Sequence, residues 1–162
     1  MTTPLQRPQS APLRFIAVRL NTPELGQVVR QAGVGEALRV TVQYHDARHP
    51  DQVATLTKSL TGTATLTTIY RRTGSAPLRL DYPVEVERMQ ALNASLRRIN
   101  FDKVDDAPSI PWFGADLWLV ERAAGSFHHD VIIAPASATG VYAEIVALIQ
   151  ANLREAVRAI NP

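Results

Sequence analysis

The chain contains no cysteine, which excludes disulfide bonds, thiol catalysis and cysteine-ligated zinc sites. Lysine is nearly missing as well, since Lys58 and Lys103 are the only two lysines among 17 basic residues. With 15 acidic residues the formal net charge is only +2, and the arginines are scattered, so nucleic acid is not favoured as a partner. No apolar run is long enough to span a bilayer, and the first residues lack the apolar core of a secretory signal. We therefore expect a cytoplasmic protein with no membrane partner.

The chain does contain enough apolar material for one core, because 46% of its 162 residues are hydrophobic. Residues 1–12 (MTTPLQRPQSAP) carry three prolines and no periodic pattern, which predicts a flexible N-terminal arm. Residues 13–162 are then expected to form a single α+β domain.

The front of this domain predicts a strand, a helix and a second strand. Alternating apolar residues in segment 13–20 (LRFIAVRL) indicate a strand buried on at least one side. A helix is expected from the Thr22-Pro23-Glu24 start to the stop at Gly33. A strand follows at residues 37–44, whereas residues 45–60 fit either a short helix or a loop.

The remainder of the chain predicts hairpin, helix, hairpin, helix. The first hairpin comprises residues 61–72 and 77–82, and Pro83 opens a helix that runs to about Ile99. The second hairpin covers residues 116–135, and the last helix runs from Gly140 to Ile160 with an apolar stripe. Together these patterns predict an antiparallel sheet of about four to six strands with helices packed mainly on one face.

The second hairpin divides its side chains between two faces if Arg122 pairs with Phe127. One face then carries Trp118, Val120, Arg122, Phe127, His129 and Val131, and the other carries Leu117, Leu119, Glu121, His128, Asp130 and Ile132. In this arrangement Glu121 lies opposite His128, which predicts a cross-strand ion pair. Since His128 and His129 point to opposite faces, they cannot bind one metal ion together.

Other candidate reactive groups do not form a convincing site. His45 and His49 would share a face only in a helix, which Pro50 disfavours, so whether the four histidines converge is left open. A hydrolase triad needs a serine, a histidine and an aspartate, and Ser126, a neighbouring histidine and Asp130 provide these residue types. Residues of one hairpin, however, cannot easily converge in the required order. We expect no catalytic residue, no metal and no cofactor.

The most promising segment for binding a partner is the proline-bearing loop before the second hairpin. Prolines stiffen a loop and aromatic side chains supply contact area. The alternative is that Trp112 and Phe113 fold back over the sheet edge as a lid on the core. The residues expected to contact a partner are Ile110, Trp112 and Phe113, with the hairpin turn Ala123, Ala124, Gly125 and Ser126.

Residues 64–160 resemble a known family. The resemblance rests on a first hairpin (TLTTIYRRTGSAPLRLDY), a helix ending in LRRINF, a proline-bearing loop, a hairpin with histidine on its return strand (ADLWLVERAAGSFHHDVII) and a closing helix. In this order of elements the chain is similar to the emfourin-like inhibitors of thermolysin-type metallopeptidases. The resemblance implies a protein partner, a peptidase.

We therefore expect a non-catalytic protein-binding or regulatory domain, with peptidase inhibition as its most concrete form. The alternative is a small enzyme or ligand-binding protein that uses a pocket between sheet and helices, with His128 or His129 and Glu121. The oligomeric state is left open.

Overall fold

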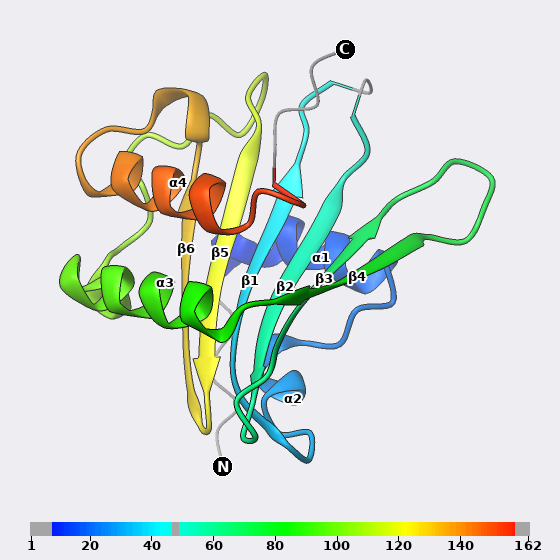
Figure 1. Ribbon diagram of the computed structural model, residues 1–162. Coiled ribbons are helices and arrows are strands. Elements are labelled where there is room, and N and C mark those ends of the chain that lie inside the picture. The colour runs from blue at the N-terminus through cyan, green and yellow to red at the C-terminus, as the bar shows by residue number, and fades with distance from the viewer. Residues whose placement is uncertain (1–7, 47–48, 158–162) are drawn as a thin grey trace.

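The structure, a computed structural model, describes residues 8–46 and 49–157 and contains a six-stranded antiparallel sheet in the order β4-β3-β2-β1-β5-β6 (Figure 1). The strands are β1 (Val34–Gln43), β2 (Gln52–Ser59), β3 (Ala64–Tyr70), β4 (Leu78–Val84), β5 (Leu117–Ala124) and β6 (Phe127–Ile133). The helices are α1 (Ala11–Arg19), α2 (Leu25–Val28), α3 (Val86–Arg98) and α4 (Val141–Asn152), with short 3₁₀ turns at Pro8–Ser10, Phe101–Lys103 and Pro135–Ser137. The predicted α+β class with a sheet of four to six strands is confirmed.

Strand β1 is the centre of the sheet. The chain passes from β1 to β4 as a meander, and α3 then carries it back so that β5 pairs with the free edge of β1. Leu38, Val40 and Val42 of β1 are fully buried. Among the described residues, no helix is long and apolar enough to cross a membrane.

The two longest helices, α3 and α4, cover one face of the sheet and enclose the larger core (Figure 1). The apolar stripe expected for the last helix is largely confirmed, since Ile145, Val146, Ile149, Leu153 and Val157 are all buried there. The helix itself ends at Asn152, and the predicted end at Ile160 lies outside the described residues.

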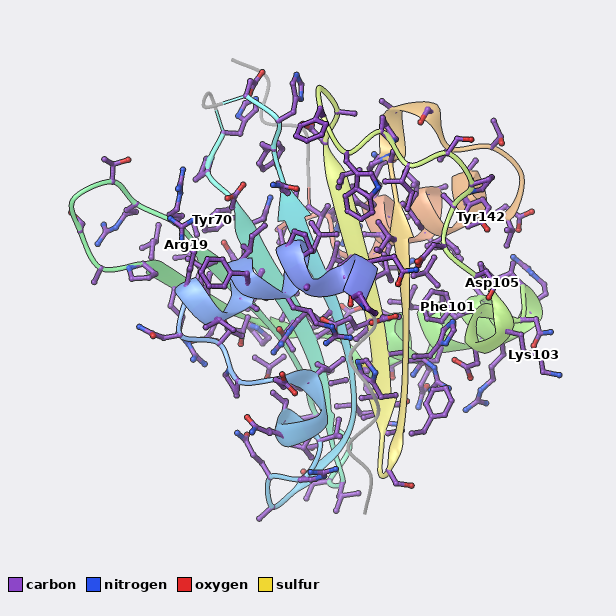
Figure 2. The ribbon with its side chains drawn as sticks, turned by 180° about the vertical axis from the view of Figure 1, so that it is seen from behind. Arg19, Tyr70, Phe101, Lys103, Asp105 and Tyr142 are labelled. Atoms are coloured by element: carbon purple, nitrogen blue, oxygen red, sulfur yellow. The ribbon has the colours of Figure 1, made fainter. Side chains whose placement is uncertain are left out.

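The opposite face is covered by α1 and α2, and seen from behind α1 lies across the strands (Figure 2). The prediction of a strand at residues 13–20 is therefore wrong. Four apolar residues of this segment pack on the sheet at the i, i+3, i+4, i+7 spacing of a helix, namely Leu13, Ile16, Ala17 and Leu20.

The N-terminal prediction also needs correction. Residues 8–12, expected to belong to a flexible arm, form a 3₁₀ turn and the start of α1, and Ser10 is fully buried. Residues 1–7 lie outside the described residues. The helix expected after Thr22 is limited to the single turn of α2.

Two further boundaries differ from expectation. The ambiguous segment 45–60 contains β2, which pairs with both β1 and β3, so its backbone groups are satisfied in the sheet. Pro83 lies in β4 instead of opening α3, which begins at Val86. Because β4 is an edge strand, a residue without an N–H is tolerated there.

The second hairpin forms as predicted but with a different register. Ala124 pairs with Phe127, and Arg122 pairs with His129, two positions from the predicted partner. A shift of two residues preserves the alternation of side chains. The predicted division of the hairpin into two faces is therefore confirmed.

An ion pair joins α3 to the segment after α4 and supports a test of this packing. Arg88 Nη1 donates to Glu155 Oε1 at 2.7 Å and to Oε2 at 2.8 Å. Burial acts to raise the pKa of Glu155, but the hydrogen bonds from Arg88, a backbone hydrogen bond and the positive charges of Arg88 and Arg154 together outweigh burial and hold the pKa below its ordinary value.

We expect Glu155→Gln to lower the free energy of unfolding by about 1 kcal/mol at pH 7. Because the pKa is lower in the folded state, the stability that this carboxylate contributes is present above its unfolded pKa and is lost as the pH falls below about 4. Urea unfolding at pH 7 and pH 3 should show the difference between variant and wild type shrinking in acid. A difference that stays constant would contradict the assignment.

Candidate functional site

The loop that carries the aromatic residues is attached to the sheet at its first end. Ala107 N donates to Ile132 O at 3.0 Å, and Ile132 N donates to Asp106 Oδ1 at 2.8 Å. The Tyr142 hydroxyl donates to the carbonyls of Asp105, near it in Figure 2, and Asp106, at 3.0 and 3.1 Å. These bonds cover the outer edge of β6 and fix where the loop begins.

The second end of the loop is held as well. Both the backbone N and Nδ1 of His45 lie within hydrogen-bond distance of Asp116 Oδ1, at 2.9 and 2.6 Å. Between the two ends, Ile110 packs against the apolar cluster under α1. Ser109 and Gly114 adopt positive φ angles of 56° and 78°, which turn the backbone on either side of the aromatic pair. The loop is therefore shaped before any partner binds.

The aromatic side chains project from this loop into solvent. Phe113 is 95% exposed and Trp112 is 42% exposed. The alternative in which both aromatics form a lid on the core is therefore wrong for Phe113, whereas Ile110 is the residue that turns inward.

The hairpin turn does not extend this surface. Ala123 is fully buried against α2, so its side chain is not available to a partner, and Ala124 is half-buried. Gly125 and Ser126 are exposed, but they lie at the far end of β5 from the aromatic loop (Figure 1), about 25 Å away by the rise of a strand.

A buried polar cluster lies beneath α1. Arg14 Nη1 donates to Glu121 Oε1 at 3.1 Å, Arg14 Nη2 donates to Asp130 Oδ2, and Arg14 Nε donates to Ser10 Oγ at 2.9 Å. The Glu121 and Asp130 side chains are only 4% and 6% exposed. His128 Nε2 lies 3.1 Å from the same Glu121 oxygen, so the predicted contact between these two residues is present, diagonally across the hairpin.

A second arginine lies beside this cluster on β1. Arg39 is 2% exposed, and it donates from Nε to Thr55 Oγ1 at 3.0 Å and from Nη1 to the Pro23 carbonyl at 2.7 Å. Burial lowers the pKa of Arg39, while the Glu121 carboxylate acts in the opposite direction. A guanidinium retains its charge at neutral pH, so two positively charged arginines act on the buried Glu121 carboxylate.

The cluster also has the composition of a metal site. One ligand atom each from Glu121, His128 and Asp130 lies within 4.8 Å of the others, and this donor set suits a divalent metal. The guanidinium of Arg14, however, is hydrogen-bonded to both carboxylates and supplies the positive charge that an ion would supply. The cluster as it stands is a set of charge-assisted hydrogen bonds.

The other histidines do not join this cluster. His129 lies on the opposite face, where its Nε2 is 2.9 Å from Val104 O and its ring packs edge-on against Phe101 at 5.4 Å. His45 contacts Asp116, and His49 packs near Tyr44 with ring centroids 5.1 Å apart. Within the described residues the four histidines do not converge.

The sequence prediction missed Arg14 and Arg39. A signal existed for Arg39, because an arginine at the centre of the apolar strand ALRVTV must be buried with partners. Arg14 carried no such signal, because its partners Glu121 and Asp130 lie more than 100 positions later in the chain. They approach Arg14 only when α1 packs on the sheet. Among the described residues, the remaining arginines form no single basic face, since the β3–β4 loop and the end of α3 lie on opposite sides of the molecule (Figure 1).

Comparison with known proteins does not assign the chain to a family. The chain matches no protein-family model, and no curated protein matches its sequence. Any assignment of function therefore depends on the two places described above, the aromatic loop and the polar cluster under α1.

Proposed function

We propose that the protein is a non-catalytic binding domain that recognises another protein through the loop carrying Trp112 and Phe113. The observation that carries this proposal is the 95% exposure of Phe113 on a loop that is tied to the sheet at both ends. A large apolar side chain held in water has no stabilising role in the free protein, and it supplies contact area when covered.

The energetics favour such a contact. Burying a phenylalanine side chain contributes about 2 kcal/mol, and aromatic residues are enriched among the few that dominate an interface. Because the bonds at Asp106, Ala107 and Asp116 already fix the loop ends, less conformational entropy is lost on binding.

Peptidase inhibition is the most concrete form of this proposal. The resemblance of residues 64–160 to emfourin-like inhibitors supports a thermolysin-type metallopeptidase as the partner. A rigid, proline-bearing loop with an exposed aromatic residue also suits an inhibitor, since a protein that resists rearrangement can occupy a peptidase cleft without being cut.

We expect the protein to inhibit a thermolysin-type metallopeptidase and Phe113→Ala to weaken inhibition about 30-fold, the effect of losing about 2 kcal/mol of binding energy. The matched control is Leu60→Ala, which removes another exposed apolar side chain, 76% exposed in the β2–β3 turn. The inhibition constants of the two variants should differ while their unfolding temperatures remain equal to that of the wild type. If Phe113→Ala lowers stability and leaves inhibition unchanged, the loop is not the binding surface.

A protein that inhibits no such peptidase would overturn the inhibitor form, and the broader proposal is then tested by site-specific cross-linking. A photoreactive phenylalanine analogue at position 113 should form a discrete adduct with a protein from the source cells, whereas the same analogue at position 60 should not. Equal labelling from both positions would contradict recognition through this loop.

A further inference from the structure

A cavity of about 190 Å³ lies between α1 and α2 on the sheet face that bears the polar cluster. Its apolar walls include Phe15, Ala17 and Val18 of α1 and Leu25 of α2, and its polar lining includes Arg39 and Glu121. Phe15 and Val18 are 58% and 60% exposed, so the cavity opens to solvent beside them.

The two polar groups of the floor are almost completely buried, yet each keeps an unused position. Within the described residues, Arg39 donates from Nε and Nη1, which leaves Nη2 for a further acceptor. Glu121 receives Arg14 and contacts His128 through Oε1, which leaves Oε2 for a further donor. The floor therefore offers one donor and one acceptor.

The charge of the cavity lining restricts the ligand. The lining carries two guanidinium groups, Arg14 and Arg39, and two carboxylates, Glu24 and Glu121. A charged ligand would upset this balance in a poorly hydrated place, at a considerable cost in free energy. A neutral group with a carbonyl beside an N–H matches both positions without adding charge.

We propose that this cavity binds a small neutral amide or lactam, whose carbonyl accepts from Arg39 and whose N–H donates to Glu121. The apolar part of the ligand packs against Phe15, Val18 and Leu25. The size agrees, since a cavity of about 150 Å³ accommodates a benzene-sized molecule. This site is separate from the aromatic loop, and it uses Glu121 without either His128 or His129.

Two probes of equal size test the hydrogen bonds directly. The lactam 2-piperidone carries a carbonyl and an adjacent N–H on a six-membered ring, and cyclohexanone has the same size but only the carbonyl. In ¹H–¹⁵N NMR titrations we expect 2-piperidone to shift the amides of residues 15–25 and the Arg39 Nε–H saturably, with a dissociation constant of about 5 mM. Cyclohexanone should bind about tenfold more weakly, because it leaves the carboxylate without a donor.

A variant pair locates the binding. Thr22 is half-buried and lines the cavity, so Thr22→Phe should fill the mouth and abolish the shifts caused by 2-piperidone. Gln27→Phe introduces the same side chain at an exposed position of α2 outside the cavity and should leave binding unchanged. The amide spectra of both variants without ligand verify that the fold is retained.

Three results would overturn the proposal. The first is no saturable shift with 2-piperidone up to about 50 mM, roughly ten times the expected dissociation constant. The second is equal affinity for the two probes, which would show that the cavity binds them through apolar contacts without the proposed hydrogen bonds. The third is a response to Zn²⁺ alone, with shifts centred on His128 and release of Arg14, which would assign the cluster to a metal instead.

Discussion

Replacing Arg14 with methionine is expected to lower the free energy of unfolding by about 3 kcal/mol. The guanidinium is hydrogen-bonded to both Glu121 and Asp130, whose side chains are 4% and 6% exposed. Methionine fills a similar volume but removes the positive charge that lies between two buried carboxylates. The cost arises mainly from carboxylates that remain buried without that charge, and urea unfolding at pH 7 measures it.

Two controls separate this effect from an ordinary loss of an ion pair. Arg79→Met breaks a pair with Asp81 whose side chains are 63% and 50% exposed, so we expect a loss of about 0.5 kcal/mol or less. Adding Glu121→Gln and Asp130→Asn to Arg14→Met removes the buried charges and should restore part of the stability. A loss for Arg14→Met no larger than that for Arg79→Met would show that the buried cluster contributes no more than a surface pair.

The second half of the fold could be predicted because its patterns are local and repeated. Helix α4 and the β5–β6 hairpin each show their periodicity over many residues. The error in the hairpin register moved the strands by two positions, and an even shift keeps every side chain on its face. Glu121 therefore still contacts His128 on the same face, although its partner in the register is Asp130.

The first half was less predictable because its patterns fit more than one structure. In segment 13–20 the apolar residues satisfy both an alternation and a helical spacing, and only packing against β1, β2 and β5 decides between them. Strand β2 pairs with β1 along one edge and with β3 along the other, and its first five residues are buried on both faces, so it carries little periodic signal. Both outcomes depend on contacts far apart in the sequence.

The same distinction applies to the two candidate sites. The aromatic loop is a continuous segment, so its composition identified Trp112 and Phe113 as candidates but left open whether they are exposed or fold back over the core. The polar cluster and the cavity combine residues from α1, β1, β5 and β6, so they exist only once the sheet has formed. Within the loop the sequence could not show which apolar residue turns inward, and the contact of Ile110 with the cluster under α1 settles that question.

A second large effect is expected at Leu13, which also tests the correction of strand to helix. Leu13 lies on the buried side of α1 and is fully buried, whereas Phe15, two residues later, is 58% exposed. In a strand these two side chains would share one face, and in a helix they diverge by about 200°. We expect Leu13→Ala to lower the free energy of unfolding by about 3 kcal/mol and Phe15→Ala to lower it by about 0.5 kcal/mol.

The comparison is informative because the two substitutions act on the same element. Alanine is a good helix former, so neither variant should lose stability through helix propensity, and the difference reports burial alone. Urea unfolding of the three proteins, monitored by tryptophan fluorescence, gives both values. Equal losses at Leu13 and Phe15 would restore the strand interpretation and remove α1 as the lid of both the polar cluster and the cavity. A large loss at Leu13 alone would establish that the cluster and the cavity are closed by a helix that packs on the sheet through one apolar stripe.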